Sequence, residues 1–353
     1  MHDRRIHRGT AAGVSAVAVA LILAACSSAG GGSPSGGGSS STLNASGSTF
    51  QLPWQQQAIQ NFKASHPSMT VNYGGGGSGK GRTDLASGVV QFAGSDSPIP
   101  SDEASSFKGK KVLYFPVLIG PITMSYNLSG VSKLQLSPDV IANIFQGKIK
   151  KWNDPAIKAD NPGVKLPSTA VTIAHRSDSS GTTENFSAFL VAASKQWKLG
   201  SSSTIKWPAN SRGGDGNGGV ASIVKSTPGA IGYVDYADAK ASNLTFASVK
   251  NQEGKYIAPS PASASAAASH DQVKTDLTFS SVWQPGATSY PITYQSWDLV
   301  FAKQKNAGDV KNLKAYLGYL LGAGQGLLPG LGYAKLPGSL DQQAKTQLSQ
   351  ITS

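Results

Sequence analysis

The feature that most constrains the fold is an alternation of β-rich runs with helical stretches, in which polar loops follow the strands. β-rich runs at 70–73 and 171–173 each precede such a loop and then a stretch with helical spacing. A Ser-Pro pair at 137–138 and an Asp-Pro pair at 154–155 predict two further helix starts. The alternation predicts an α/β protein with open sheets, whose ligands bind beyond the carboxyl ends of strands.

Proline and glycine residues that interrupt β-rich runs predict where the chain crosses between two lobes. Pro116 and a Gly-Pro pair at 120–121 interrupt the run 112–124, so we expect two buried strands joined by a crossing there. Similar interruptions near 285–291 predict the return of the chain to the first lobe. The expected division is lobe I at 44–118 and 292–353 and lobe II at 119–291, with a ligand cleft between them. The alternative is a single large α/β domain.

The first residues are predicted to direct export and anchoring. Three arginines among the first eight residues precede an uncharged apolar run at 11–25 and the lone cysteine, Cys26. This order predicts a lipoprotein signal peptide over 1–25 and acylation of Cys26, on the extracytoplasmic face of the cell membrane. The alternative is an ordinary secretory peptide. Residues 26–43, rich in Gly and Ser, are expected to be a tether.

The positive charge of the chain does not by itself identify a partner. The formal net charge is +12, from 31 Lys and Arg against 19 Asp and Glu. The lysines are scattered, without interleaved aromatic residues, so we expect solvated surfaces rather than nucleic-acid binding. Five histidines without ligand spacing argue against zinc, and a calcium-like loop at 215–219 lacks the glutamate at its twelfth position.

Three short polar loops are predicted to surround one small anion. They lie at 74–81 with Ser78, at 94–98 with Asp96, and at 176–183. The first and third loops each follow a strand and precede a helix. Backbone N–H groups and a positive helix end are therefore expected at both loop tips, an arrangement that holds phosphate, sulfate or carboxylate.

The glycine-rich loop permits two other interpretations. Its sequence at 74–80 approaches the P-loop pattern, but Gly81 stands where that motif requires Ser or Thr to ligate magnesium. A flexible linker is the second alternative, although linkers rarely separate a strand from a helix, here expected over 82–86. We favour a backbone cradle to which Ser78 adds a hydroxyl.

Asp96 is unexpected in an anion site because a carboxylate repels anions. It becomes useful when the ligand carries a proton, since an ionised carboxylate only accepts hydrogen bonds. A site built around one ligand hydroxyl rejects analogues lacking it by roughly four to five powers of ten. The alternative is a turn residue in the sequence Ser-Asp-Ser-Pro at 95–98.

The third loop supplies the expected counter-charge. Arg176 offers a planar fork for two oxygens, and Asp178 is predicted to hold that fork in place. Ser180, Gly181 and Thr182 would present hydroxyls and N–H groups at the start of a helix. A surface arginine near a helix cap is one alternative. A hydrolase triad of His175, Asp178 and Ser180 is another, disfavoured because the three lie close along one segment without a nucleophile elbow.

These motifs resemble a known family. The ligand loops are similar to those of the phosphate-binding protein of bacterial phosphate ABC importers, PstS, in the segments Ala45-Ser-Gly-Ser-Thr-Phe50, Val71-Asn-Tyr-Gly74, Gly94-Ser-Asp-Ser-Pro98 and Arg176-Ser-Asp-Ser-Ser-Gly-Thr182. The second of these segments continues through the glycine run to Ser78. Further similarity occurs in Lys151-Trp-Asn-Asp154, Thr227-Pro-Gly-Ala-Ile-Gly-Tyr233 and Tyr290-Pro-Ile292. The resemblance runs from about residue 44 to the last residue.

The resemblance implies a type II periplasmic (solute)-binding protein fold that closes over phosphate without catalysis or a cofactor. The implied partners are inorganic phosphate and ABC permease subunits, and the implied state is a monomer. The implied contacts are Thr49, Phe50, Ser78, Asp96, Arg176, Ser180, Gly181 and Thr182, with Asp178 supporting the arginine. Two departures from the family pattern are Gln51, where proline is common, and Lys80 beside the glycine loop. The alternatives are a receptor for sulfate or an organic phosphate, and a secreted phosphoesterase.

Overall fold

The computed structural model describes residues 41–353. The predicted signal peptide, Cys26 and most of the predicted tether lie outside the described residues. Strand β1 begins at Ser41, so it includes the last three residues assigned to the tether by composition. The reason is that Leu43 is fully buried and pairs in register with Val71 of the neighbouring strand.

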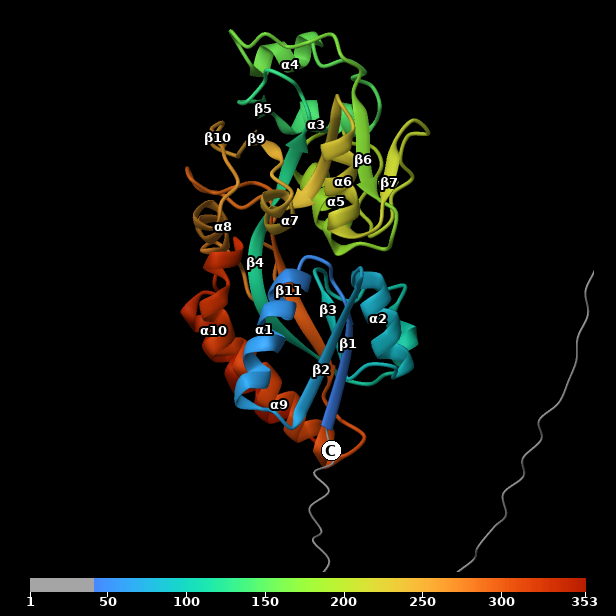
Figure 1. Cartoon of the computed structure of the whole chain (residues 1–353), viewed down its shortest axis with the longest axis vertical. Coiled ribbons are helices and arrows are strands. Elements are labelled where there is room, and N and C mark those ends of the chain that lie inside the picture. The colour runs from blue at the N-terminus through green and yellow to red at the C-terminus, as the bar shows by residue number, and fades with distance from the viewer. Residues whose placement is uncertain (1–40) are drawn as a thin grey trace, which may run out of the picture. The chain divides into compact units, whose positions relative to one another are not determined.

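The described residues alternate between strands and helices along most of their length, as predicted (Figure 1). The strands are β1 (Ser41–Gly47), β2 (Met69–Gly76), β3 (Phe92–Ser95), β4 (Val112–Tyr126), β5 (Gln135–Leu136), β6 (Thr172–Arg176), β7 (Arg212–Gly214), β8 (Ala230–Asp235), β9 (Thr245–Lys250), β10 (Tyr256–Ile257) and β11 (Thr293–Phe301). The α-helices are α1 (Leu52–Ser65), α2 (Ser78–Ser87), α3 (Pro138–Phe145), α4 (Pro155–Asp160), α5 (Gly181–Ala193), α6 (Gly216–Ser226), α7 (Tyr236–Ala241), α8 (Pro261–Ala268), α9 (Ala307–Leu321) and α10 (Gly338–Gln347). None of these helices is long and apolar enough to cross a membrane.

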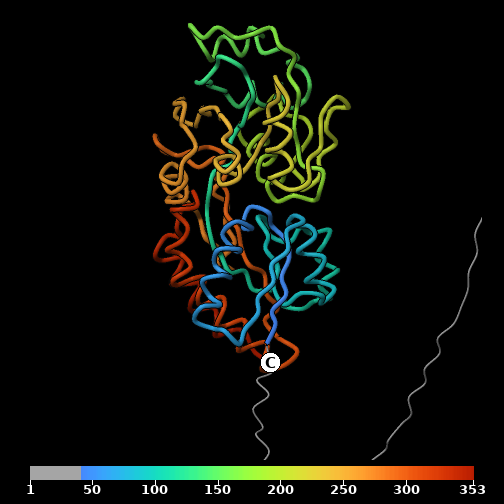
Figure 2. Tube along the Cα trace, viewed as in Figure 1, coloured from blue at the N-terminus to red at the C-terminus, as the bar shows by residue number. Residues whose placement is uncertain are grey.

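The strands form a curled mixed sheet that runs through two lobes. Its main path has the order β2-β1-β3-β11-β4-β8-β6-β7. Lobe I is built on the parallel strands β1, β2 and β3, and lobe II on the parallel strands β6, β7 and β8. Strands β4 and β11 are antiparallel to each other and run between the two groups (Figures 1 and 2).

The prediction of two strands within 112–124 was wrong, because β4 is one continuous strand. Pro116 lies opposite Trp297 at a β-bulge that leaves Val117 of β4 without a partner in β11, and Pro121 lies opposite Thr293, the first residue of β11. Immediately after this point β4 changes partner from β11 to β8. Proline removes a ladder donor, and both prolines occupy places where the ladder is already interrupted. The single strand β4 therefore makes the crossing between lobes.

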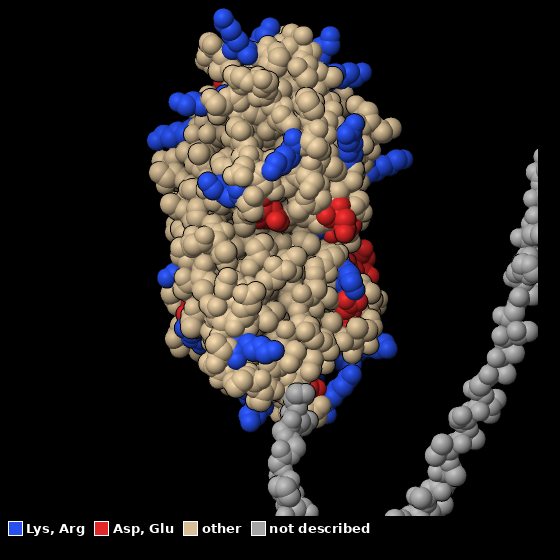
Figure 3. Space-filling view, in the orientation of Figure 1, with Lys and Arg blue, Asp and Glu red and all other residues tan. Residues whose placement is uncertain are grey.

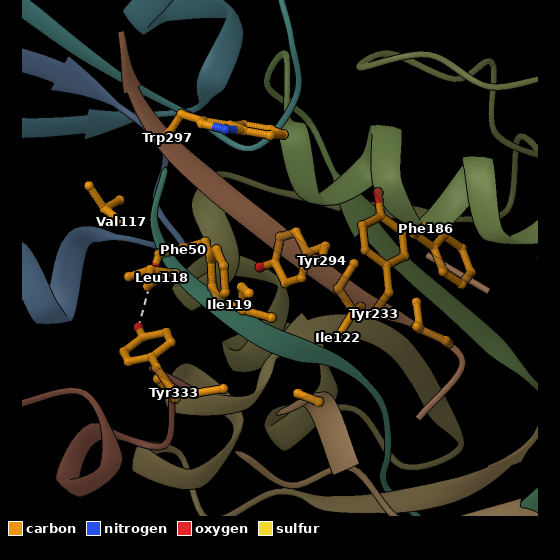
Figure 4. Packing of buried hydrophobic residues seen from close by; sticks show 14 of the residues in the cluster. Phe50, Val117, Leu118, Ile119, Ile122, Phe186, Tyr233, Tyr294, Trp297 and Tyr333 are labelled. Atoms are coloured by element: carbon orange, nitrogen blue, oxygen red, sulfur yellow. Dashed lines mark hydrogen bonds between the residues drawn. The ribbon is translucent and has the colours of Figure 1, made fainter. Parts of the chain in front are cut away.

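An aromatic cluster beside β4 and β11 holds the loop that follows β1. The fully buried ring of Phe50 stacks on Tyr294 with ring centroids 3.9 Å apart, and Tyr333 packs edge-on at 5.2 Å. The Tyr333 hydroxyl also donates to the Phe50 carbonyl at 2.8 Å (Figure 4). Buried aromatic pairs of this kind add stability beyond their buried area. The backbone around Phe50 is thus fixed against the central strands.

The carboxyl ends of the parallel strands in both lobes lead into the predicted loops. In lobe I, β1, β2 and β3 end at Gly47, Gly76 and Ser95. In lobe II, β6 and β7 end at Arg176 and Gly214. Ligand sites in open α/β sheets lie beyond such ends.

Candidate functional site: a buried polar site between the lobes

Helices α2 and α5 begin on opposite sides of the boundary between the lobes, and their first turns are in contact. The N–H of Gly79 donates to the carbonyl of Ser179 at 3.1 Å. A Cβ atom on Gly181 would lie 2.4 Å from Ser78 Oγ and 2.6 Å from Asp96 Cβ, so the helix start leaves no room for a side chain. Two positive helix ends therefore converge where the sequence predicts an anion.

Helix α2 begins at Ser78, four residues before the expected start at 82. Its glycines have low helix propensity, so the sequence does not predict the first turn of the helix. They are needed for packing, since a Cβ on Gly81 would lie 2.7 Å from the Cα of Gly47 in β1. The glycine-rich run thus continues from the strand into the helix and brings Ser78 into the site.

Asp96 follows β3 and is held by three serine hydroxyls. Its Oδ1 accepts from Ser48 Oγ and from Ser296 Oγ, each at 2.5 Å, while its Oδ2 accepts from Ser78 Oγ at the longer distance of 3.3 Å. The Asp96 residue is 1% exposed. One carboxylate oxygen is therefore saturated by short bonds, and the other retains capacity to accept a proton from a ligand.

The environment of Asp96 changes its acidity. Burial raises the pKa of Asp96 from its ordinary value of 3.8 to about 6, while hydrogen bonds from Ser296, Ser48 and Ser78 and the charge of Arg176 act in the opposite direction. Because the pKa lies below 7, the carboxylate is ionised at neutral pH. It then accepts hydrogen bonds and donates none.

Arg176 ends β6 and is almost completely buried. Its Nε donates to Asp178 Oδ1 at 2.7 Å, one terminal nitrogen pairs with Asp178 Oδ2, and the other donates to Thr182 Oγ1 at 3.3 Å. Burial alone would lower the pKa of Arg176, but Asp178 keeps that pKa above its ordinary value. Three of the five N–H donors of a guanidinium are engaged, so one on each terminal nitrogen remains for a bidentate ligand.

The start of α5 presents the polar groups expected of the third loop. Ser180 is the N-cap, and its Oγ accepts from the N–H of Thr183 at 3.1 Å. The N–H groups of Gly181 and Thr182 belong to the first helical turn, where no intrahelical acceptor exists. Ser180 and Thr182 are fully buried.

The loop after β1 brings Thr49 and Phe50 to the same region. Thr49 Oγ1 accepts from the Asn217 side chain at 3.1 Å, across the boundary between the lobes. The Phe50 N–H donates to Ser48 Oγ at 3.1 Å. The structure thus brings together all eight residues expected to contact the ligand. Among them, the N–H of Phe50 already donates to Ser48.

Several polar residues of the site were not predicted. Ser48 and Ser296 fix Asp96, Asn217 links two threonines, and Asn185 Nδ2 donates to the Asp96 carbonyl at 2.7 Å. Ser48 belongs to the segment Ala45–Phe50 that resembles a ligand loop of the family, so its role was predictable from the sequence. Ser296 lies 200 positions from Asp96 in the sequence and carries no local signal.

The residues of the disfavoured hydrolase triad do not form a triad within the described residues. His175 Nδ1 lies 2.8 Å from the carbonyl of Arg176, and its ring stacks on Trp207. Ser180 Oγ caps α5, and Asp178 binds Arg176. Burial lowers the pKa of His175, which favours the neutral imidazole.

The two departures from the family pattern have structural explanations. Gln51 is fully buried and donates to Ser296 Oγ at 2.8 Å and to the carbonyl of Trp297 at 2.9 Å. It therefore supports the serine that holds Asp96. Lys80, whose side chain is 54% exposed, pairs with Asp84 at 2.5 Å on the surface of α2.

A groove of about 550 Å³ lies next to the site at the boundary between the lobes. It is lined by residues of both lobes, including Thr49, Gly76 and Asn217. Asp215, from the calcium-like loop, is the N-cap residue of α6 and lies on this groove. Among residues 41–353, no three His, Cys, Asp or Glu side chains are close enough to hold a metal ion. On the face drawn in Figure 3, Lys and Arg are scattered over both lobes.

A polar site buried between two lobes, at the carboxyl ends of parallel strands, defines the class of solute-binding proteins with the periplasmic-binding-protein fold. The family model described as the PBP superfamily domain matches residues 32–323. "Phosphate-binding protein PstS 3" of Mycobacterium leprae is 36% identical over 323 residues, which cover 88% of this chain and 87% of the relative. "Phosphate-binding protein PstS" of Haemophilus influenzae is 35% identical, with 88% and 94% covered. The chain belongs to the PstS family of phosphate-binding proteins.

Solved structures support the same fold. A high-affinity periplasmic phosphate-binding protein, PfluDING, bound with phosphate, superposes with a TM-score of 0.73 at 19% identity, covering 87% of this chain and 93% of that chain. A putative phosphate ABC transporter substrate-binding protein with bound phosphate from Clostridium perfringens gives 0.62 at 18% identity, with 84% and 100% covered. The prediction of a two-lobed periplasmic-binding-protein fold is therefore confirmed.

Proposed function

We propose that this protein binds inorganic phosphate outside the cytoplasm and delivers it to the permease of an ABC importer. The observation that carries the proposal is the placement of a buried acceptor, Asp96, beside the donors of Arg176 and two helix starts. An anion that also carries a proton satisfies both kinds of group. Phosphate at neutral pH is such an anion, and sulfate is not.

In this proposal each predicted residue has one role. Arg176 binds two phosphate oxygens through its two remaining donors, while Asp178 holds its plane. Asp96 Oδ2 accepts the phosphate proton. The hydroxyls of Thr49, Ser180 and Thr182, with the N–H groups of Phe50, Ser78, Gly181 and Thr182, donate to the remaining lone pairs. The N–H of Phe50 would do so as a three-centre bond shared with Ser48. The Ser78 hydroxyl turns its one proton from Asp96 Oδ2 to the ligand when Oδ2 accepts the phosphate proton.

The proposed location and partners follow from the sequence and from the relatives. Relatives named phosphate-binding protein PstS, and a neighbour named as a substrate-binding protein of a phosphate ABC transporter, support capture and delivery. We propose that acylated Cys26 anchors the protein to the outer face of the cell membrane through the part of the predicted tether that precedes β1. We also propose a monomer in which lobe I comprises 41–118 and 292–353 and lobe II comprises 119–291.

We further propose that the protein has no catalytic activity. A phosphoesterase with a serine nucleophile needs a base in contact with that serine, and the two candidates, Ser180 and His175, are occupied with a helix cap and a backbone carbonyl. The relatives that match are named as binding proteins. A turnover assay on a generic phosphomonoester, with and without divalent metal, would contradict the proposal if it detected hydrolysis proportional to enzyme concentration.

Calorimetric titration tests the binding proposal. Protein freed of bound phosphate is titrated with inorganic phosphate at neutral pH, and separately with sulfate and with a phosphomonoester. We expect one tight site for phosphate, and sulfate should barely displace it. Equal affinity for sulfate would instead identify a general oxyanion receptor, and tighter binding of the phosphomonoester would identify an organic-phosphate receptor.

A further inference from the structure

Asn217, in the first turn of α6, connects the two lobes at the site. Its backbone N–H and its side-chain Nδ2 donate to Thr49 Oγ1 in lobe I, at 3.3 and 3.1 Å. The same Nδ2 donates to Thr182 Oγ1 in lobe II at 3.3 Å. The residue is fully buried. It is therefore in contact with one predicted ligand hydroxyl from each lobe.

These contacts determine the direction in which both hydroxyls donate. A threonine hydroxyl has two acceptor lone pairs and one proton. Two N–H groups of Asn217 occupy the lone pairs of Thr49 Oγ1, and Asn217 together with Arg176 occupies those of Thr182 Oγ1. Each hydroxyl is left with its proton to donate elsewhere, and the proposed anion would accept it.

The orientation of the Asn217 amide matters for this argument. Its Oδ1 is buried and has no hydrogen-bond partner among the described residues. In the reverse orientation, that oxygen would face both hydroxyls, and their protons would turn toward it and away from the ligand. The reverse orientation would also place the two N–H groups of Nδ2 in the buried position where Oδ1 has no partner, so the present orientation leaves fewer polar groups unpaired.

We propose that Asn217 is a positioning residue for the proposed phosphate site, which orients the Thr49 and Thr182 hydroxyl protons toward the anion and joins the lobes in the closed form. The inference rests on the proposed function and deepens it. Asn217 itself needs no contact with the ligand.

Three variants of the full chain test the inference by titration with inorganic phosphate. Asn217→Ala removes both side-chain donors and should weaken binding by about 10- to 100-fold. Asn217→Asp has nearly the same shape, but its carboxylate accepts from both hydroxyls and repels the anion. At pH 8 it should bind at least about tenfold more weakly than Asn217→Ala. Ser222→Asp, on the exposed side of α6, adds the same charge away from the site and should stay within about twofold of the unchanged protein.

The pH dependence separates orientation from simple structural damage. The ratio of the dissociation constants of Asn217→Asp and Asn217→Ala cancels the titration of phosphate itself. This ratio should fall toward one as the pH drops from 8 to 5, because the new buried carboxyl becomes protonated and regains a donor. A structural defect would leave the ratio unchanged.

Each outcome has a defined meaning. Binding by Asn217→Ala within twofold of the unchanged protein, or a ratio that does not vary with pH, would overturn the inference. If thermal unfolding shows that Asn217→Asp does not fold, Asn217→Ala decides alone by its affinity. If the unchanged protein does not bind phosphate, the proposed function fails instead, and the two failures are distinguishable.

Discussion

The two lobes bring buried charges of opposite sign to the site and stabilise them in different ways. In lobe II, Arg176 is paired with a carboxylate two residues away, Asp178, through two contacts. In lobe I, Asp96 has no cationic partner in its own lobe and is surrounded by the hydroxyls of Ser48, Ser78 and Ser296. The charge of Arg176 is thus neutralised within its own lobe, whereas that of Asp96 is stabilised in its own lobe only by hydroxyl dipoles.

This difference shows how the site would hold an anion without a net positive charge. One guanidinium and two carboxylates give the three groups a formal charge of −1 at neutral pH. Attraction must then come from directed N–H and O–H donors and from the starts of α2 and α5, which act over short distances. Selection comes from Asp96, which only a protonated ligand can satisfy.

The largest effect is expected from Arg176→Ala, which removes the charge of lobe II. The buried carboxylate of Asp96 and the partly buried one of Asp178 lose their counter-charge, and the ligand loses a bidentate donor pair. Phosphate affinity should fall by about a thousandfold or more, measured by calorimetry. Arg212→Ala, an exposed arginine in the same lobe, is the matched control and should bind normally. A loss of less than tenfold in Arg176→Ala would mean that the lobe I groups suffice.

Gly181→Ala should separate closure from folding. The added methyl would meet Ser78 Oγ at 2.4 Å and Asp96 Cβ at 2.6 Å, both in the opposite lobe. Within its own helix the alanine is acceptable, because Gly181 is the first residue of α5. We expect about a hundredfold weaker phosphate binding, with an unfolding temperature that is unchanged or higher.

The control for this variant is Gly218→Ala in α6, where a Cβ would meet no atom within 4 Å. It makes the same chemical change in a helix of the same lobe. Equal affinity losses in Gly181→Ala and Gly218→Ala would contradict the close approach of the two lobes.

Asp96→Asn should change selection more than affinity. The amide still accepts through its oxygen and can also donate, so a ligand without a proton is no longer opposed. Phosphate should bind within about tenfold of the unchanged protein, while sulfate should gain about a hundredfold or more, since rejection by one unpaired polar group can reach four to five powers of ten. Competition calorimetry at neutral pH measures both. Continued exclusion of sulfate would assign selectivity to some other group.

The pH dependence of stability tests the buried charge of lobe I, Asp96. Burial raises the pKa of Asp96 to about 6 from 3.8, so the folded protein holds this proton more tightly than the unfolded chain does. Its contribution to stability is complete below about pH 4 and is lost as the pH rises through about 6. The difference of about two pH units corresponds to roughly 3 kcal/mol.

Denaturant unfolding of phosphate-free protein checks this prediction. Between pH 4 and 7, the free energy of unfolding should fall relative to that of Asp96→Asn, which lacks the titrating group. The comparison cancels the contributions of other buried carboxyls to the pH dependence. Examples are Asp298 and Asp271, because burial raises their pKa values to about 8 and about 7. Parallel curves for the two proteins would show that Asp96 is ionised throughout this range.

Sequence analysis predicted the parts of the site that depend on local order along the chain. Ser78, Asp96 and Arg176 each lie at or next to the end of a strand, so the geometry of open sheets brings them together. The sequence does not predict that Ser296 and Asn217 contact the site, because their positions depend on tertiary contacts between distant segments. The single strand β4 was missed for a related reason, since only pairing with β11 shows that its prolines are tolerated.

The smallest effect is expected from Lys80→Gln, which tests whether lobe I supplies a cation to the site. Lys80 is 54% exposed and pairs with Asp84, four residues along α2, while Ser46 Oγ also donates to Asp84 at 2.6 Å. Exposed pairs contribute little, and physiological salt screens charges beyond about 8 Å. Phosphate affinity should change less than twofold, at low salt as well as at physiological salt. A loss above tenfold that disappears in high salt would mean that Lys80 acts on the ligand. The two lobes would then both supply cations, and the contrast between a locally paired Arg176 and a dipole-solvated Asp96 would no longer explain how the anion is held.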